Sequence, residues 1–328
     1  MSDVVVLGAG VVGLTTAVRL AEAGARVVVL TADDPADTVS RVAAAVWYPT
    51  RTSGDPRVLG WAGRTFEVLA GHARQAVPGV VMRPTRMLLR EPATGDPWWA
   101  PAVPDFRAVA PPDGYAGQWR FTVPTVEMGP YLAWLVDRLA RLEVPVRRYR
   151  VDRLADVPAI AAEVWPSARR PPLVVNATGL AAGKLADDPA VHPIRGRIVL
   201  VGNPGLTTSV RDEGNPAGST YVHPRSRDVV LGGTFEPYRT ETGPDEEAGA
   251  AILARCVALV PELAGAPVLG QLAGLRPGRL GGARLAEDVS GLAGSARLVH
   301  NYGHGGAGIT LGWGCADEVV ALVVGQTP

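Results

Sequence analysis

The stretch VVVLGAGVVGLTTAVRLAEAGARVVVLTAD, residues 4–33, decides the fold of the first part of this chain. Residues 4–7 and 26–30 are β-branched apolar runs, which are typical of buried strands. Between them, apolar residues recur at helical spacing after a G-x-G-x-x-G turn, and Gly24 ends the helix. The order strand, glycine turn, helix, strand predicts a dinucleotide-binding unit.

Each glycine of the turn has a physical role in such a unit. Gly8 allows the tight turn, Gly10 lets the backbone approach a pyrophosphate, and Gly13 lets the helix pack on the strand. The helix N-terminus offers N–H groups and a partial positive charge to the phosphates. Asp33 lies 20 residues after Gly13, where a carboxylate can bind a ribose hydroxyl. The motif does not separate NAD from FAD.

Composition excludes several classes of partner. The 328 residues carry 32 Lys and Arg against 32 Asp and Glu, a balance that indicates neither nucleic acid nor an anionic membrane as a partner. Apolar stretches are too short or interrupted to span a bilayer. The two cysteines, Cys256 and Cys315, are expected to be buried free thiols, and the five histidines show no metal-binding spacing. We therefore expect a cytoplasmic protein without a metal site.

The rest of the chain alternates between helical and strand patterns. Periodicity predicts helices over 55–77, 124–143, 244–260 and 309–324, and strands over 80–90, 173–176 and 298–300. Several strands with turn signals fall within 194–235, whereas 91–118 is typical of loops. Both ends of the chain therefore have a βα pattern, and the middle is typical of an antiparallel sheet. This predicts an α/β fold, a discontinuous Rossmann-like domain with an inserted antiparallel-sheet domain.

A second glycine cluster precedes the last predicted helix. Gly303, Gly305, Gly306 and Gly308 remove side chains where backbone N–H groups could contact a ligand. One dinucleotide needs only one helix N-terminus for its pyrophosphate, so a second one indicates another anionic group, such as the pyrimidine edge of a reduced flavin. The alternative is a glycine-rich packing site for the helix.

Two polar side chains are candidates for substrate binding. Arg276 lies in LRPGR, residues 275–279, where flanking Pro and Gly predict a stiff turn that aims the guanidinium at a carboxylate. The alternative is a surface arginine in a salt bridge. Tyr221 and His223 alternate in a predicted strand and so share one face, although such an aromatic residue is usually part of a core. No nucleophile–base arrangement stands out, which favours a reaction whose chemistry a cofactor supplies.

Eight segments carry a resemblance to a known family. They are GAGVVGL (8–14), AAAVWYP (43–49), VVNATG (174–179), IRGRIV (194–199), YVHP (221–224), LGGTF (231–235), GLRPGR (274–279) and HNYGHGGAGITLGWGCA (300–316). On these motifs the chain resembles the D-amino-acid/D-aspartate oxidase family of FAD flavoproteins over nearly its whole length.

The resemblance implies a role for particular residues. Arg276 matches the arginine that pairs with the substrate carboxylate, Tyr221 the tyrosine beside it, and the Gly306 carbonyl the acceptor of the substrate amine. His223, Tyr48 and Val46 are expected in the substrate pocket. The positions expected to contact FAD are Gly8, Gly10, Val11, Val12, Gly13, Asp33, Ala43, Ala44, Trp47, Val151, Thr178, Gly179, Gly303, Gly305, Gly306, Gly308 and Thr310.

The resemblance also implies a reaction and a domain division. The reaction is oxidation of a D-amino acid by molecular oxygen to a 2-oxo acid, ammonia and hydrogen peroxide. Residues 1–50, 124–193 and 276–328 would form the FAD-binding domain, and 51–123 with 194–275 the substrate-binding domain. A homodimer is left open. D-aspartate oxidase is the nearest alternative, followed by a glycine or sarcosine-type oxidase, an NAD-dependent dehydrogenase and a non-catalytic nucleotide-binding module.

Two positions depart from the family pattern. Ala217 stands where mammalian members carry a second tyrosine on an active-site lid, and the segment before Tyr221 is short, so a lid of that kind is not expected. Phe235 stands where D-aspartate oxidases typically place an arginine for the second carboxylate. The sequence therefore favours neutral or basic D-amino acids over D-aspartate as substrates.

Overall fold

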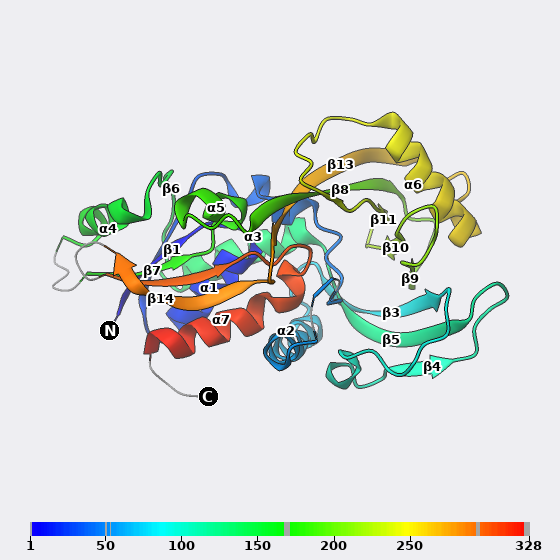
Figure 1. Ribbon diagram of the computed structural model, residues 1–328, viewed down its shortest axis with the longest axis horizontal. Coiled ribbons are helices and arrows are strands. Elements are labelled where there is room, and N and C mark those ends of the chain that lie inside the picture. Colours follow the sequence, from blue (N-terminus) through cyan, green and yellow to red (C-terminus); the bar gives the residue numbers. More distant parts are fainter. Residues whose placement is uncertain (1, 50, 53, 167–170, 293–295, 325–328) are drawn as a thin grey trace.

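Two β-sheets form the frame of the computed structural model, which describes residues 2–49, 51–52, 54–166, 171–292 and 296–324 (Figure 1). The first sheet has six strands in the order β14-β15-β7-β1-β2-β6. Its strands are parallel except for β14, which runs antiparallel to β15. They are β1 (Asp3–Leu7), β2 (Arg26–Thr31), β6 (Val146–Arg148), β7 (Leu173–Asn176), β14 (Arg284–Leu292) and β15 (Ala296–Tyr302).

The predicted βαβ unit lies at the centre of this sheet. β1 pairs in parallel with β2 on one side and with β7 on the other, so Leu7, Leu30 and Asn176 end at one edge. Helix α1 (Val11–Glu22) begins directly after the glycine turn. A Cβ at Gly13 would overlap the carbonyl of Gly8, because the helix passes close above the turn. The glycine spacing therefore fixes how α1 leaves the sheet.

The second sheet has nine strands and is mostly antiparallel. The order is β12-β8-β11-β10-β9-β3-β5-β4, and β13 pairs with β8. Only β3 and β9, among the strand pairs described in this sheet, run parallel. The strands are β3 (Val80–Leu89), β4 (Arg107–Val109), β5 (Gly117–Val126), β8 (Val191–Gly202), β9 (Ser209–Asp212), β10 (Thr220–Pro224), β11 (Asp228–Gly232), β12 (Glu236–Pro237) and β13 (Val268–Arg279).

Helices pack on both sheets. Figure 1 shows α1 and the C-terminal α7 (Gly308–Val324) side by side along the first sheet, with α2 (Pro56–Arg74) next to them. Helix α6 (Glu246–Leu259) packs on the second sheet. The remaining helices are α3 (Met128–Arg141), α4 (Val157–Val164) and the short α5 (Ala182–Leu185).

The α/β prediction is confirmed, with two corrections to local structure. The helix expected from 124 begins at Met128, because residues 124–126 complete β5, where the Pro124 carbonyl accepts from Trp47 and Val126 donates to the Ala45 carbonyl. The prediction of a stiff turn around Arg276 is wrong. Residues 275–279 lie in β13 and pair with β8. Proline is tolerated there because β13 pairs with β8 alone among the strands that the structure describes.

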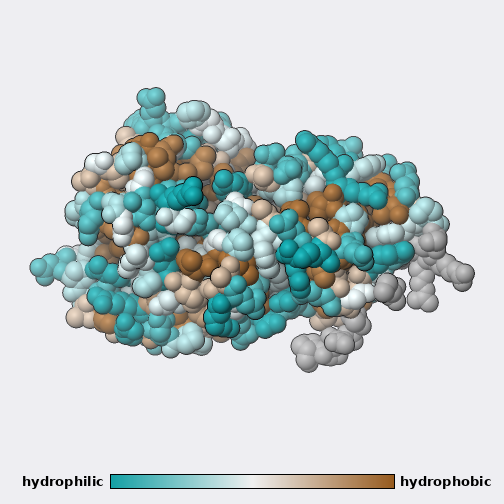
Figure 2. Space-filling view, turned by 180° about the vertical axis from the view of Figure 1, so that it is seen from behind, coloured by the Kyte–Doolittle hydropathy of each residue, from teal (hydrophilic) through white to brown (hydrophobic). Residues whose placement is uncertain are grey.

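The surface and the cysteines agree with the composition. The face in Figure 2 mixes hydrophilic residues with several separate hydrophobic patches. Cys256 and Cys315 are free and buried, and burial raises the pKa of the Cys256 thiol to about 12. Within the described residues, every helix is too short or too polar to cross a membrane.

The contact between α2 and α7 leaves no room for a side chain at Gly314. A Cβ there would overlap the backbone of Trp61, and the Gly314 N–H donates to Thr65 Oγ1 at 2.9 Å. We expect Gly314→Ala to lower the free energy of unfolding by about 1–3 kcal/mol through overpacking, measured by urea denaturation. Gly60→Ala on α2 is the control, because nothing lies within 4 Å of its Cβ position. Equal stability of the two variants would contradict this packing.

A half-buried histidine lies where α2, α3 and α7 meet. The His72 ring lies 4.9 Å from the Trp134 ring and 5.3 Å from the Trp313 ring. Trp313 donates to the Tyr131 hydroxyl at 2.8 Å, so that hydroxyl can give its proton to His72 Nδ1 at 3.1 Å. This arrangement requires an unprotonated Nδ1. Burial, with a contribution from Arg19, lowers the pKa of His72 to about 4.

This histidine makes stability depend on pH. Between pH 6.5 and about 4 the unfolded chain binds a proton at His72 that the folded protein does not, so the free energy of unfolding falls as the pH falls through this window and is fully retained above it. Thermal melts at pH 7 and pH 5 should show a smaller loss in His72→Gln than in the wild type. An identical loss in both proteins would refute this role.

Candidate functional site

Both predicted glycine turns and the predicted substrate residues face one cavity of about 650 Å³. Its lining comes from both sheets and from the starts of α1 and α7. The predicted residues that line it are Gly10, Val11, Val12, Ala43, Ala44, Val46, Tyr48, Gly179, Tyr221, His223, Arg276, Gly303, Gly305, Gly306 and Gly308. The fold thus brings residues from the whole length of the chain to one place.

Several predicted cofactor residues lie just outside the cavity lining and contact residues near or in it. A Cβ at Gly8 would lie 2.5 Å from the Ala177 carbonyl, so Gly8 and Gly13 let the turn sit close to β7 and α1. Thr178 donates to Asn176 Oδ1 at 2.7 Å. Thr310 Oγ1 donates to the Tyr48 carbonyl at 3.1 Å, which ties the start of α7 to the 43–49 segment.

Three other predicted cofactor residues lie away from the cavity lining. The Trp47 indole is fully buried among aromatic rings, 5.3 Å from Phe66, and donates to the Ala62 carbonyl. Val151 packs on the apolar core beside β1 and β2. Asp33 follows β2, its side chain 61% exposed and 3.7 Å from Arg150. Their contacts with a cofactor stay predictions.

The part of the cavity at the start of α1 contains a residue that the sequence patterns did not reveal. Ser40 lines the cavity, and its Oγ accepts from the N–H of Val11, the first residue of α1, at 2.9 Å. Gly10 is packed closely there, because a Cβ on it would lie 3.3 Å from this oxygen. Ser40 lies outside any motif, so only the folded chain shows that it completes the turn.

The second glycine cluster lies against β13. The Gly305 N–H donates to the Pro277 carbonyl at 2.8 Å, and a Cβ at Gly303 would lie 2.7 Å from the Cβ of Arg279. Buried His304 also lines the cavity, and within the described structure its Nε2 has no hydrogen-bond partner. Burial lowers the pKa of His304 to about 4, so the ring is neutral at neutral pH.

Arg276 extends from β13 across β8. Its Nη1 donates to the Thr234 carbonyl at 3.1 Å. A Cβ at Gly196 would overlap the guanidinium, so glycine is required beneath it. Among the described residues, no carboxylate lies within ion-pair distance of this half-buried guanidinium. Arg276 therefore presents an uncompensated positive charge to the cavity, which suits a carboxylate ligand.

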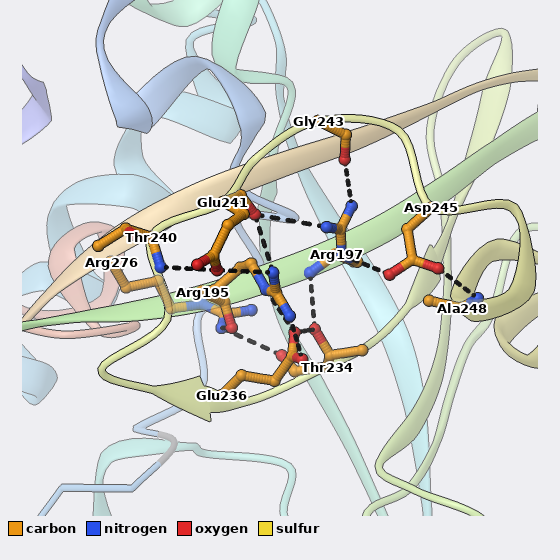
Figure 3. A network of polar contacts seen from close by, with 10 residues as sticks. All are labelled: Arg195, Arg197, Thr234, Glu236, Thr240, Glu241, Gly243, Asp245, Ala248 and Arg276. Atoms are coloured by element: carbon orange, nitrogen blue, oxygen red, sulfur yellow. Dashed lines mark hydrogen bonds and ion pairs between the residues drawn. The ribbon is translucent and has the colours of Figure 1, made fainter.

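A polar network fixes the carbonyl that holds Arg276 (Figure 3). Arg195 on β8 donates to both carboxylate oxygens of Glu236, at 2.6 and 2.9 Å. Thr234 Oγ1 accepts from the Arg197 N–H at 3.0 Å and donates to Glu236 at 2.8 Å. Arg197 also lies 3.5 Å from Asp245, the N-cap of α6. These bonds hold the segment from Thr234 to Asp245 on β8 and fix the Thr234 carbonyl.

The Tyr221 ring lies directly against two glycines. A Cβ at Gly232 would overlap its ring, and one at Gly233 would lie 2.7 Å from its hydroxyl. The ring stacks on His223, with centroids 4.8 Å apart. Burial raises the pKa of Tyr221, an effect that Arg276 and Arg211 partly oppose. The phenol is therefore neutral at neutral pH and keeps a proton to donate.

Arg211 and Glu213 form a second charged group in the cavity that the sequence patterns did not reveal. Arg211 lies over the Tyr48 ring, with its Cζ 4.0 Å from the centroid, and donates to Glu213. Burial, and then Arg211, lower the pKa of His223, so this histidine is neutral as well. Neither residue lies in a motif, and only the pairing of β9 with β10 reveals their place beside Tyr221.

The arrangement is suited to binding rather than to acid–base or metal chemistry by the protein. Tyr221, His223 and His304 are all held in their neutral forms. The described residues contain no group of three or more His, Cys, Asp or Glu that could hold a metal ion. The cavity offers a fixed guanidinium, a phenolic donor and two glycine-lined turns, which is what a cofactor enzyme requires of its protein.

The residues present fit a flavin dinucleotide. Gly10 and Ser40 leave the start of α1 without bulky side chains, as a pyrophosphate requires. At the other end, glycines lead into α7, and the orphaned Nε2 of His304 and Oδ1 of Asn301 are buried polar atoms in cavity-lining residues. Small residues Ala43 and Ala44 line the wall between the two ends.

Comparisons with known proteins agree with this geometry. A family model described as FAD dependent oxidoreductase matches residues 3–322. The chain is 47% identical to a D-amino-acid oxidase of Rubrobacter xylanophilus, over 97% of this chain and 94% of that protein. It is 41% identical to a D-amino-acid oxidase of Streptomyces coelicolor, over 98% and 96% of the two chains.

Solved structures show the same fold. Glycine oxidase from Geobacillus kaustophilus superimposes with a TM-score of 0.82 at 19% identity, covering 100% of this chain and 96% of that one. Glycine oxidase from Bacillus cereus gives a TM-score of 0.77 at 18% identity, covering 100% and 96%. At these identities the likeness concerns the fold alone. The family model and the two closely similar relatives carry the assignment, and the chain belongs to the FAD-dependent oxidoreductase family that contains the D-amino-acid oxidases.

Proposed function

We propose that this protein oxidises D-amino acids with FAD and molecular oxygen to imino acids, which water hydrolyses, so that a 2-oxo acid, ammonia and hydrogen peroxide are released, and that neutral or basic D-amino acids are preferred. The observation that carries the proposal is Arg276. Its guanidinium lacks a carboxylate partner among the described residues and faces the same cavity as both glycine turns and Tyr221. The relatives named D-amino-acid oxidase support the same reading.

The division of labour within the chain follows from this proposal. Residues 1–50, 124–193 and 276–328 would hold FAD, with Gly10 and Ser40 at the pyrophosphate and Gly305 to Gly308 at the flavin. Residues 51–123 and 194–275 would hold the substrate. FAD, when bound, supplies the two-electron redox chemistry, and molecular oxygen is the final acceptor. The buried free thiols are compatible with a cytoplasmic location, and a homodimer stays open.

Three groups of the chain would orient the substrate. Arg276 binds the α-carboxylate through its planar fork, and the Tyr221 hydroxyl donates a second hydrogen bond to it. The Gly306 carbonyl accepts from the α-amine. With carboxylate and amine both fixed, the Cα hydrogen of only one enantiomer points toward the cofactor side. The residues thus act by orientation rather than by proton abstraction.

D-aspartate oxidation is the second candidate, and one observation favours it. Arg211 is a second guanidinium in the lining of the cavity, and it could meet a second carboxylate. Against this, Arg211 is already paired with Glu213, and the apolar ring of Phe235 stands next to Arg276, with the Arg276 Cζ 6.0 Å from its centroid. We therefore rank neutral and basic substrates first.

A spectrum and a peroxide assay test the proposal. The purified protein should show flavin absorbance, and acid denaturation should release the flavin, because buried Cys315 faces inward in α7 and offers no attachment point. Peroxide release should be at least about 100-fold faster with D-alanine than with L-alanine. A colourless active protein would point instead to a nicotinamide enzyme, and equal rates with both enantiomers would refute the assigned orientation.

The role of Arg276 predicts graded effects of substitution. Removing one partner of a buried charge pair costs about 2–5 kcal/mol. At about 1.4 kcal/mol per tenfold, Arg276→Leu should lose roughly 30- to 3,000-fold in kcat/KM for D-alanine while flavin stays bound. Arg276→Lys should recover only part of this, since an ammonium lacks the planar fork. Tyr221→Phe removes one neutral hydrogen bond, worth about 0.5–1.5 kcal/mol, and should cost less.

The control is an arginine outside the cavity. Arg297 on β15 pairs with both oxygens of Glu287, at 2.6 and 2.9 Å. Arg297→Leu should leave kcat/KM close to that of the wild type. If Arg276→Leu retained near-normal activity, the carboxylate would have to be assigned to another arginine of the cavity.

A further inference from the structure

The register of β9 with β10 places Arg211 beside the proposed substrate site. Arg211 pairs directly with Tyr221, so both side chains lie on one face of the sheet. Arg211 Nη1 is 3.4 Å from His223 Nε2, and its Cζ is 5.8 Å from the Tyr221 ring centroid. The guanidinium is therefore wedged between Tyr48, Tyr221 and His223, next to the groups assigned to the substrate.

The charges that line the cavity are strongly unequal. Four arginines contribute to the described lining, Arg51, Arg211, Arg276 and Arg279, whereas Glu213 is the one carboxylate among those lining residues. Arg211 is 7% exposed and Glu213 is 29% exposed. The buried guanidinium is thus neutralised by a more accessible carboxylate. A ligand side chain that approaches this pair meets the charge of Glu213 before that of Arg211.

We propose that Glu213 is the specificity-determining residue for the charge of the substrate side chain, because its carboxylate neutralises Arg211 and is the more exposed member of the pair. This inference rests on the proposed function and deepens it. Arg276 would take the α-carboxylate, and the Arg211–Glu213 pair would sort the side chains. Neutral chains lie against Tyr48 and Tyr221, a cationic chain is attracted to Glu213, and an anionic chain is repelled by it.

In this proposal, Arg211 can bind an anionic side chain once the charge of Glu213 is removed. Without the charge of Glu213, the buried guanidinium of Arg211 would lack a counter-ion. An anionic substrate side chain would then take the place of the Glu213 carboxylate. The same substitution should therefore weaken basic substrates and strengthen acidic ones. A merely structural role of Glu213 would change all substrates in the same direction.

Glu213→Gln tests this with three substrates that differ in side-chain charge. We expect kcat/KM for D-glutamate relative to D-norvaline to rise at least about tenfold, equivalent to about 1.4 kcal/mol, and that for D-ornithine relative to D-norvaline to fall by a similar factor. Glu213→Asp keeps the charge and should keep the wild-type ratios. Glu287→Gln removes the carboxylate of the Arg297–Glu287 ion pair, which lies outside the cavity, and should also leave the kcat/KM ratios unchanged.

Ligand binding separates this proposal from the proposed function. The non-reacting carboxylates valerate, 5-aminovalerate and glutarate can be titrated into the flavin-loaded wild type and Glu213→Gln while the absorbance is followed. The order of their dissociation constants should shift toward glutarate in the variant, whether or not the wild type turns over any D-amino acid. Unchanged orders and ratios in Glu213→Gln, or equal changes in Glu287→Gln, would overturn the charge role of Glu213. Absence of peroxide with all three substrates, together with a shifted binding order, would refute only the proposed reaction.

Discussion

A guanidinium without a carboxylate partner is the feature around which the site is arranged. Among the described residues Arg276 has carbonyl contacts but no ion pair, and this favours the binding of an anion beside it. Its position requires two conditions. Gly196 must lack a Cβ, and the Thr234 carbonyl must be held in place, which the ion pairs of Arg195 and Arg197 achieve from the same strand. In the network of Figure 3, Arg195 and Arg197 are paired with carboxylates, so they act on Arg276 by fixing the position of the Thr234 carbonyl.

Several other titratable groups that line the cavity are neutral or paired. Tyr221 and His223 are desolvated and stacked, His304 is buried, and Arg211 is balanced by Glu213. Such a lining supplies few groups able to exchange protons at neutral pH. This agrees with a family in which FAD supplies the redox chemistry and the protein supplies binding and orientation.

The two sheets meet the cavity in different ways. The parallel sheet presents the carboxyl ends of its strands and the starts of α1 and α7, where backbone amides and small residues suit an anionic cofactor. The second sheet presents the faces of its strands, so side chains such as Tyr221, His223 and Arg211 project from one surface. Main-chain groups thus dominate the end of the cavity proposed for the cofactor, and side chains dominate the end proposed for the substrate. This explains why glycine motifs identify the proposed cofactor end, whereas isolated polar residues identify the proposed substrate end.

The sequence by itself determined the features that depend on local chain geometry. The glycine spacing around Gly8 and Gly13, the alternation of β-branched strands and the second glycine cluster predicted the α/β fold and both helix starts, because each depends on neighbouring residues only. Sequence context made Arg276 and Tyr221 candidates with alternatives left open, and the family resemblance supplied their expected roles. Only the tertiary structure placed Arg276 in a strand, because its conformation is set by pairing with β8, far away in the sequence. The same holds for Ser40 at α1 and for the Arg211–Glu213 pair beside Tyr221. Contacts of that kind depend on strand register and on which segments meet, and no local pattern in the chain encodes them.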